Sequence, residues 1–285
     1  MFKSTADLHE KAFSGFSDVD HSGDPRSFIQ YLDTSNADEE VRRIKLQFIK
    51  LLDPQKGWKV LDIGCGLGHD THLLTRLVSR TGRVVGLDKS NSLIREAQRR
   101  LHGVTLPLEF RTGDAHRLDF PDNTFHGCLV SRTFIHLEHP RKALAEIGRV
   151  LKPGGRVAAL EPDWDTLVMT TGQTAASRKI VQILRHSMRQ SGIAHKLPML
   201  FRQAGFRGIA VHAGTFMVSD YAVANEAWRV QANIENARRS GMLSSVEARK
   251  LLCQLRWGSK TGLFFGAVTG FAVIGQKPEH AEEFR

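Results

Sequence analysis

The sequence is poor in the residues that build several classes of protein. Its 285 residues include only three cysteines, Cys65, Cys128 and Cys253, which are far apart and form no Cys-x-x-Cys pair. That scarcity argues against a disulfide framework or a zinc site, and it predicts a chain without metal in the reducing cytoplasm. We find no run of about 18 apolar residues that would predict a membrane-spanning helix. Residues 1–10 carry acidic side chains and no apolar core, so we expect no secretory signal there.

The overall composition is that of a globular protein with an uneven charge. Hydrophobic residues make up 41% of the chain and charged residues 25%, which argues against disorder as the main state. The net charge is +10, and residues 166–285 hold 16 Lys/Arg against 7 Asp/Glu. An anionic partner, whether substrate, RNA or lipid head group, would be attracted to that segment. A solvated basic surface explains the excess equally well, because no Lys/Arg run exceeds two residues.

The middle third alternates short β-branched runs with helical periodicity. The predicted strands are residues 59–63, 83–87, 108–111, 125–130 and 156–161, with helices over 70–80, 90–100 and 140–151. About five alternations of this kind are typical of a doubly wound α/β fold with a parallel sheet.

The flanking segments predict additional helices and two more strands. We expect helices over 38–52, 174–191, 196–204, 221–240 and 244–257, and strands over 207–218 and 262–275. Helices inserted before the last strand would lie at the carboxyl edge of the sheet, where ligands bind in such folds. We therefore interpret them as a lid.

A glycine-rich turn, Gly64-Cys-Gly-Leu-Gly68, follows the first predicted strand and opens a helix. Such a turn lets the backbone approach a ligand closely and points the helix N-terminus at it. Residue 69 is His, so the spacing is G-x-G-x-G rather than the dinucleotide pattern G-x-G-x-x-G. Asp88 follows about 20 residues later at the tip of the second strand, where a carboxylate can accept two hydrogen bonds from a ribose diol.

Asp114 adds a third point at the same edge, just past the third predicted strand. Its carboxylate can accept from an exocyclic amine, and the backbone N–H of Ala115 can donate to a ring nitrogen. Each acid alone could be an ordinary turn residue at the end of a strand. Together with Asp62 before the glycines, the pattern predicts binding of an amino acid, a ribose and an adenine in sequence order.

These motifs resemble those of a known enzyme family. The segments 60–68, 113–115 and 151–155, together with Asp88, resemble the ordered motifs of class I S-adenosylmethionine-dependent methyltransferases. Residues 119–126 and 131–136 resemble the type 11 methyltransferase-domain group, which includes ubiquinone/menaquinone-biosynthesis C-methyltransferases and bacterial natural-product methyltransferases. The resemblance covers residues 58–161, extends weakly to 197–206 and 270–276, and does not include the lid helices.

The resemblance implies a seven-stranded Rossmann-like sheet and S-adenosyl-L-methionine as the cofactor, with S-adenosyl-L-homocysteine as product. The element pattern divides the chain into three parts: an N-terminal helical cap over 1–57, a cofactor-binding α/β core over 58–165, and the remaining sheet with the substrate lid over 166–285. The cofactor residues that the resemblance implies are Gly64 and Gly66 near the methionine, Asp88 at the ribose, Asp114 and Ala115 at the adenine, and Ser131 at the methionine end. Lys89 either flanks the adenine or is a surface lysine. In the N-terminal helical segment, Arg42 and Lys45 could reach the cofactor carboxylate, and Tyr31 could close over it.

The substrate side is less well defined. Methyl transfer from a sulfonium is an in-line SN2 displacement, which needs a base only if the attacking atom carries a proton of high pKa. His136 is the candidate catalytic residue, as a base or a substrate contact, although it could simply pack against the following turn. Asp163 and Trp164 could form a substrate-binding corner, or the acids could cap the next helix. Trp228 could line a substrate pocket or belong to the core of the lid.

We therefore predict a methyltransferase acting on a small-molecule acceptor: an aromatic, quinone-like or secondary-metabolite scaffold. The alternatives are an RNA methyltransferase using the basic C-terminal third and a cofactor-binding protein without catalysis. Residues 131–134 (Ser-Arg-Thr-Phe) stand where amino-methylating enzymes often carry Asn/Asp-Pro-Pro-aromatic, which argues against an amide or exocyclic-amine target of that type. The apolar residues of the lid could also be buried against a second subunit, so a homodimer is an open alternative. Whether carbon, oxygen or nitrogen accepts the methyl group stays open.

Overall fold

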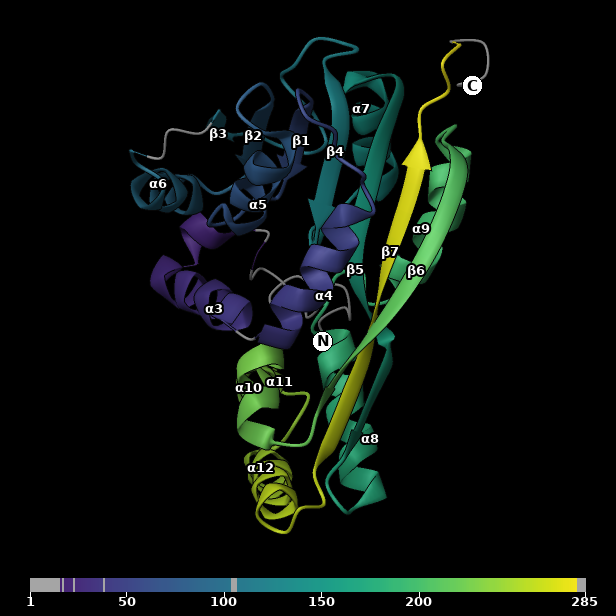
Figure 1. Cartoon of the computed structure of the whole chain (residues 1–285). Coiled ribbons are helices and arrows are strands. Elements are labelled where there is room, and N and C mark those ends of the chain that lie inside the picture. Colours follow the sequence, from purple (N-terminus) through teal and green to yellow (C-terminus); the bar gives the residue numbers. More distant parts are fainter. Residues whose placement is uncertain (1–15, 17, 23, 38, 104–106, 281–285) are drawn as a thin grey trace, which may run out of the picture.

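A computed structural model describes residues 16, 18–22, 24–37, 39–103 and 107–280. Within them a seven-stranded sheet has the order β3-β2-β1-β4-β5-β7-β6 (Figure 1). Its strands are β1 Lys59–Ile63, β2 Arg83–Asp88, β3 Leu108–Thr112, β4 Phe125–Ser131, β5 Leu151–Thr170, β6 Arg207–Val218 and β7 Phe265–Gln276. The first five strands are parallel, and β7 runs antiparallel to β5 and β6. The predicted doubly wound α/β sheet is confirmed.

Helices cover both faces of the sheet. They are η1 Val19–His21, α3 Pro25–Ala37, α4 Glu39–Lys50, α5 His69–Val78, α6 Asn91–Arg100, η2 Phe134–His136, α7 Pro140–Val150, α8 Thr174–His186, α9 Ile193–Gln203, α10 Tyr221–Trp228, α11 Val230–Arg239 and α12 Ser245–Lys260. Successive strand residues point to opposite faces, so β1 contributes Val60 to a core shared with α4 and α5, and Leu61 to one shared with α7 and α9. Burial on both faces explains why its apolar run is nearly continuous.

Strand β5 is much longer than predicted. The prediction ended it at residue 161, but it pairs with β7 as far as Thr170 opposite Phe265, with a register shift between Asp163 and Val168. The acids and Pro162 in this stretch suggest a loop, yet the antiparallel partner strand supplies the missing hydrogen bonds. The strand therefore runs through residue 165, the predicted boundary between core and lid segment.

The predicted helix over 221–240 is broken at Arg229. This residue adopts a left-handed backbone conformation with φ +51° and separates α10 from α11. Its guanidinium lies over the rings of Phe28 and Tyr31, 5.6 and 5.7 Å from their centroids. Both rings belong to α3, a helix that the sequence analysis missed although Pro25 at its first position is a typical start signal.

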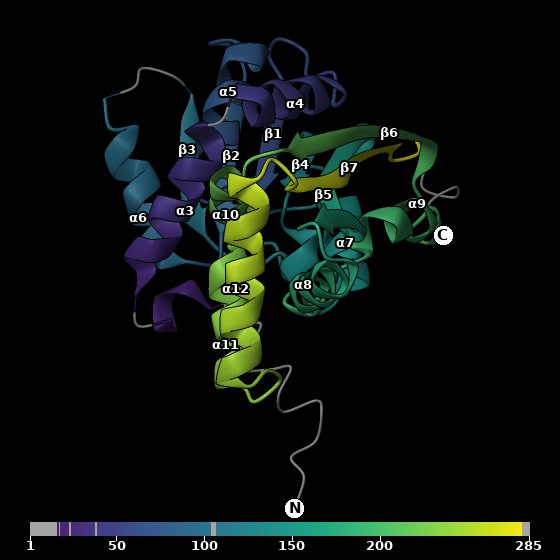
Figure 2. The ribbon, with the colours of Figure 1, turned by 90° about the horizontal axis from the view of Figure 1, so that it is seen from below.

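The inserted helices lie beyond the carboxyl ends of the parallel strands, as expected. In Figure 1, α10, α11 and α12 lie below β1 to β4, at the level where α8 flanks the lower part of β5 and β7, and Figure 2 shows α3 flanking α10. The hydroxyl of Tyr31 donates to the carbonyl oxygen of Ala227 at 3.1 Å, which ties α3 to α10. The N-terminal cap and the lid are therefore joined over the same edge of the sheet.

The sequence analysis also made predictions about the cysteines and about membrane-spanning helices. Cys65 and Cys128 are buried thiols, Cys253 is exposed, and all three are free. In the part of the chain that the structure describes, every helix is too short or too polar to cross a bilayer.

Candidate active site

The turn between β1 and α5 is held in a conformation that requires glycine. Gly64 and Gly66 have φ of +72° and +52°, and a Cβ added to Gly64 would lie 2.0 Å from Oγ1 of Thr133. Beneath the turn, the buried Asp62 accepts a hydrogen bond from the Thr71 hydroxyl at 2.6 Å, and burial raises the pKa of Asp62 to about 7. The turn therefore presents bare backbone to the space above it.

Asp88 lies at the end of β2, directly beside this turn. One carboxylate oxygen accepts from the backbone N–H of Gly66 and the other from that of Ser90, each at 2.9 Å. Burial raises the pKa of Asp88, while these N–H groups oppose the shift. Each oxygen has a further lone pair with which to accept from a ligand hydroxyl.

Asp20, which the sequence analysis missed, caps α6 from η1. Its carboxylate accepts from the Ser90 hydroxyl at 2.7 Å and from the backbone N–H groups of Asn91 and Ser92 at 2.8 and 3.1 Å. Burial would raise the pKa of Asp20, but these hydrogen bonds lower it to about 2. Asp20 and Ser90 are 70 residues apart in the sequence, so no local sequence pattern predicts this contact.

One cavity of about 1520 Å³ connects all the predicted cofactor residues. Tyr31, Gly64, Gly66, Asp88, Lys89, Asp114, Ala115 and Ser131 all line it. Asp114 accepts from the backbone N–H and the ring of His116 at 2.8 and 2.7 Å, which fixes its carboxylate at the rim. The structure thus brings together residues that the sequence analysis selected one by one.

The inner end of the cavity beside Ser131 holds a compact polar cluster. Lys45 on α4 is 2.7 Å from the buried Asp70, and its ammonium donates to the side chain of Asn36 at 2.9 Å. Burial lowers the pKa of Lys45, while Asp70 opposes the shift. Lys45 lines the cavity as expected, whereas Arg42 lies exposed on α4 outside it, which corrects that expectation.

Comparisons with known proteins agree with this geometry. A family model described as a methyltransferase domain matches residues 61–159. An uncharacterized 37.1 kDa protein in transposon TN4556 of Streptomyces fradiae is 33% identical over 249 residues, covering 87% of this chain and 71% of that protein. A demethylmenaquinone methyltransferase of Symbiobacterium thermophilum is 30% identical over 206 residues, covering 59% of this chain and 80% of the relative. The chain belongs to the class I S-adenosylmethionine-dependent methyltransferases.

The fold of this methyltransferase also has solved counterparts. The YcgJ protein of Bacillus subtilis superposes with a TM-score of 0.58 at 19% identity, covering 82% of this chain and 97% of that one. S-adenosylmethionine is the cofactor of the family and of this enzyme. The cavity suits it, because the bare turn at Gly66 and the acids Asp88 and Asp114 offer a close backbone and two carboxylates along one wall.

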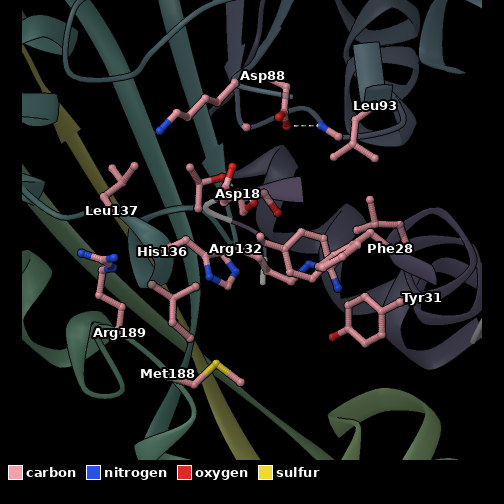
Figure 3. Close-up of a pocket in the computed structure, with 18 of the residues that line it drawn as sticks. Asp18, Phe28, Tyr31, Asp88, Leu93, Arg132, His136, Leu137, Met188 and Arg189 are labelled. Carbon is pink, nitrogen blue, oxygen red and sulfur yellow. Dashed lines mark hydrogen bonds between the residues drawn. The ribbon is translucent and has the colours of Figure 1, made fainter. Parts of the chain in front are cut away.

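The opposite half of the cavity holds the predicted acceptor residues. His136, Trp164 and Trp228 line it, and Figure 3 shows His136 in the wall between Arg132 and Arg189. Desolvation lowers the pKa of His136 to about 4, and both arginines add to this shift. His136 is therefore neutral at neutral pH.

Asp163 is the exception among the predicted acceptor residues. It is absent from the cavity wall and fully buried, and its carboxylate accepts from the backbone N–H of His195 at 2.9 Å and that of Asp165 at 3.0 Å. The ring of His195 lies 2.6 Å from the same carboxylate. Asp163 thus binds the first turn of α9, and the predicted substrate contact is corrected. The alternative, a cap on the next helix along the chain, is not what the structure shows either, because that helix is α8.

Glu161 positions the loop that carries His136, a role that the sequence analysis did not assign. Its buried carboxylate accepts from the backbone N–H groups of Thr133 and Phe134 at 2.7 Å and from that of Ile135 at 3.4 Å. Burial raises the pKa of Glu161 to about 8, although these donors and Arg132 oppose the shift. The middle of β5 therefore fixes η2 against the cavity.

Proposed function

We propose that this methyltransferase transfers the methyl group to a small-molecule acceptor with an aromatic or quinone-like scaffold. The observation that carries the proposal is the single cavity, which is lined at one end by Asp88 and Asp114 and at the other by Trp164 and Trp228. Cofactor and acceptor can therefore meet without crossing a barrier of packed side chains.

The residues that line the acceptor half support a partly apolar, aromatic molecule. The rings of Trp164 and Trp228 meet edge to face with centroids 6.5 Å apart, and Phe28 and Tyr31 face the cavity from α3 (Figure 3). Both tryptophans are 5% exposed and also belong to the hydrophobic core, and Phe28 is 6% exposed. Only a small part of each ring can therefore contact an acceptor, and that contact is apolar. The relative named as a demethylmenaquinone methyltransferase supports a quinone-like acceptor.

The helices that cover the cavity, which we call its roof, favour a small acceptor over RNA. Helices α10 and α11 extend over it, and the hydrogen bond from Tyr31 to Ala227 joins them to α3. A folded RNA would need a nucleotide flipped beneath this roof. A free small molecule needs only to enter the cavity.

We assign the chain two tasks in the transfer. When bound, S-adenosylmethionine supplies a methyl group on a good leaving group, so the protein mainly has to hold the acceptor in line and exclude water. The aromatic walls orient the acceptor, and the lid helices shield it. His136 is a contact to the acceptor in this proposal, because an imidazole with a pKa of about 4 is a weak base at neutral pH.

The test is a transfer assay with methyl-labelled S-adenosylmethionine and a cell extract separated into small molecules, RNA and protein. The proposal predicts label in the small-molecule fraction, from which mass spectrometry identifies the acceptor. Trp228→Ala should reduce that label, while Trp257→Ala, a change to an exposed tryptophan outside the cavity, should not. Label confined to RNA would contradict the proposal.

A further inference from the structure

The acceptor half of the cavity is lined by an excess of positive charge. Between residues 131 and 240, its described lining contains the arginines Arg132, Arg189, Arg229 and Arg239. In that stretch the lining has one carboxylate, Glu138, whose side chain is 65% exposed. The N-terminal segment adds Asp24 and Asp18, and the carboxylate of Asp18 is 2.6 Å from the ring of His21. A cavity built only for a neutral aromatic molecule has no need of this charge.

Two of these guanidinium groups flank His136. In Figure 3, Arg132 and Arg189 lie on either side of the imidazole and reach it from the loop after β4 and the loop between α8 and α9. Arg132 donates to the Ser35 hydroxyl at 3.3 Å, and Arg189 is 3.9 Å from the exposed Glu138. Each guanidinium has five N–H donors, so both retain donors for a ligand.

Two of the four arginines have an unusual backbone conformation. Five non-glycine residues in the described part of the chain have positive φ, and two of them are Arg132, at +53°, and Arg229, at +51°. The N–H of Arg132 donates to the carbonyl oxygen of Leu160 at 2.8 Å, which locks the turn. Strained residues of this kind concentrate where a ligand must be contacted.

The remaining polar atoms of this half of the cavity also suit an oxygen ligand. The indole nitrogen of Trp164 is buried and has no hydrogen-bond partner in the described structure. An indole N–H can only donate, so it needs an acceptor atom. The two guanidinium groups line the cavity directly, and their natural partner is an oxygen with negative charge.

We infer that the methyl acceptor carries an anionic oxygen, as a carboxylate or as an ionised acidic hydroxyl, which binds between Arg132 and Arg189 beside His136. The inference rests on the proposed function and narrows its substrate class. Arginine suits this task because its planar fork matches two oxygen atoms at once. An acceptor that binds already ionised also requires no strong base from the cavity wall.

Binding of matched probe pairs tests the inference without any turnover. Calorimetry at neutral pH, with S-adenosylhomocysteine present, compares naphthoate with its neutral analogue acetonaphthone, and hydroxynaphthoquinone with its methyl ether. The first pair reports on a carboxylate and the second on an ionised hydroxyl. We expect the anionic member of at least one pair to bind about tenfold more tightly than its neutral partner, as a charge-assisted hydrogen bond provides.

Two variants assign the preference to the cavity. Arg189→Gln should remove it while leaving the neutral probes unaffected, and Arg95→Gln, which removes an exposed arginine on α6, should keep it. The inference is overturned if no anionic probe binds more tightly than its partner, or if Arg95→Gln has the same effect as Arg189→Gln. The methyl-transfer assay separates this inference from the proposed function. If the label reaches only neutral small molecules, the proposed function holds and this inference is wrong. If anionic probes bind more tightly but no methyl group is transferred, the anion site holds and the proposed function is wrong.

Discussion

Replacing Asp88 with alanine should weaken cofactor binding strongly. The carboxylate already accepts from the N–H groups of Gly66 and Ser90, and its remaining lone pairs face the cavity. A hydrogen bond to a charged group contributes about 1.5–3 kcal/mol, so the loss of even one ribose contact corresponds to an increase in Kd of about 10- to 150-fold. Loosening of the glycine turn would add to this loss, because the Gly66 N–H loses its partner.

Calorimetry with S-adenosylhomocysteine measures the effect directly. The matched control is Asp119→Ala, which removes an exposed acid outside the cavity and should leave the Kd unchanged. An analogue without the two ribose hydroxyls separates the two causes, because Asp88→Ala should cost it only the contribution of the loosened turn. An unchanged Kd for the full ligand in folded Asp88→Ala would refute the assignment of Asp88 to the ribose.

Three further changes test how the cavity is built. Gly64→Ala should destabilise the fold by about 1–3 kcal/mol more than Gly103→Ala in denaturant unfolding, because both glycines have positive φ but only Gly64 also faces a clash, with Thr133; equal losses would show that the clash is relieved. Asp20→Ala should cost about 1 kcal/mol as a lost helix cap. Because the pKa of Asp20 is lowered from 3.8 to about 2, that stability is present above pH 3.8 and disappears as the pH falls toward 2; a difference from wild type that does not change with pH would contradict the capping role. For Glu161 the sign is opposite: its pKa is raised from 4.5 to about 8, so stability is complete below pH 4.5 and is lost as the pH rises through 8. Glu161→Gln should flatten this dependence, and an unaltered pH profile of the melting temperature would rule out Glu161 as its source.

The cofactor half of the site could be predicted from the sequence because its signals are local. Strands β1, β2 and β4 are mostly apolar runs, and Gly64, Asp88 and Asp114 each lie at or within two residues of the end of a strand. In a parallel sheet those ends share one edge, so spacing along the chain translates into proximity.

The arrangement of the acceptor half of the site could not be predicted, because it depends on contacts between segments that are far apart in the sequence. The break at Arg229 comes with contacts to two rings of α3, and the extension of β5 depends on pairing with β7. Asp20 and Glu161 find their partners about 70 and about 28 residues away. None of these contacts leaves a periodic or adjacent signal in the sequence. Arg132 lies in a motif that the sequence analysis used, but its place beside His136 and Arg189 follows only from the folded chain.

The central claim is that one cavity binds the cofactor at one end and a small-molecule acceptor at the other. Methyl transfer from labelled S-adenosylmethionine to the small-molecule fraction of an extract, measured at varied cofactor concentration for three proteins, tests it most directly. We predict that wild type labels a small molecule, that Asp88→Ala raises the KM for the cofactor, and that Trp228→Ala lowers the rate without changing that KM. Label that appears only in RNA or protein, or a Trp228→Ala variant as active as wild type, would contradict the account.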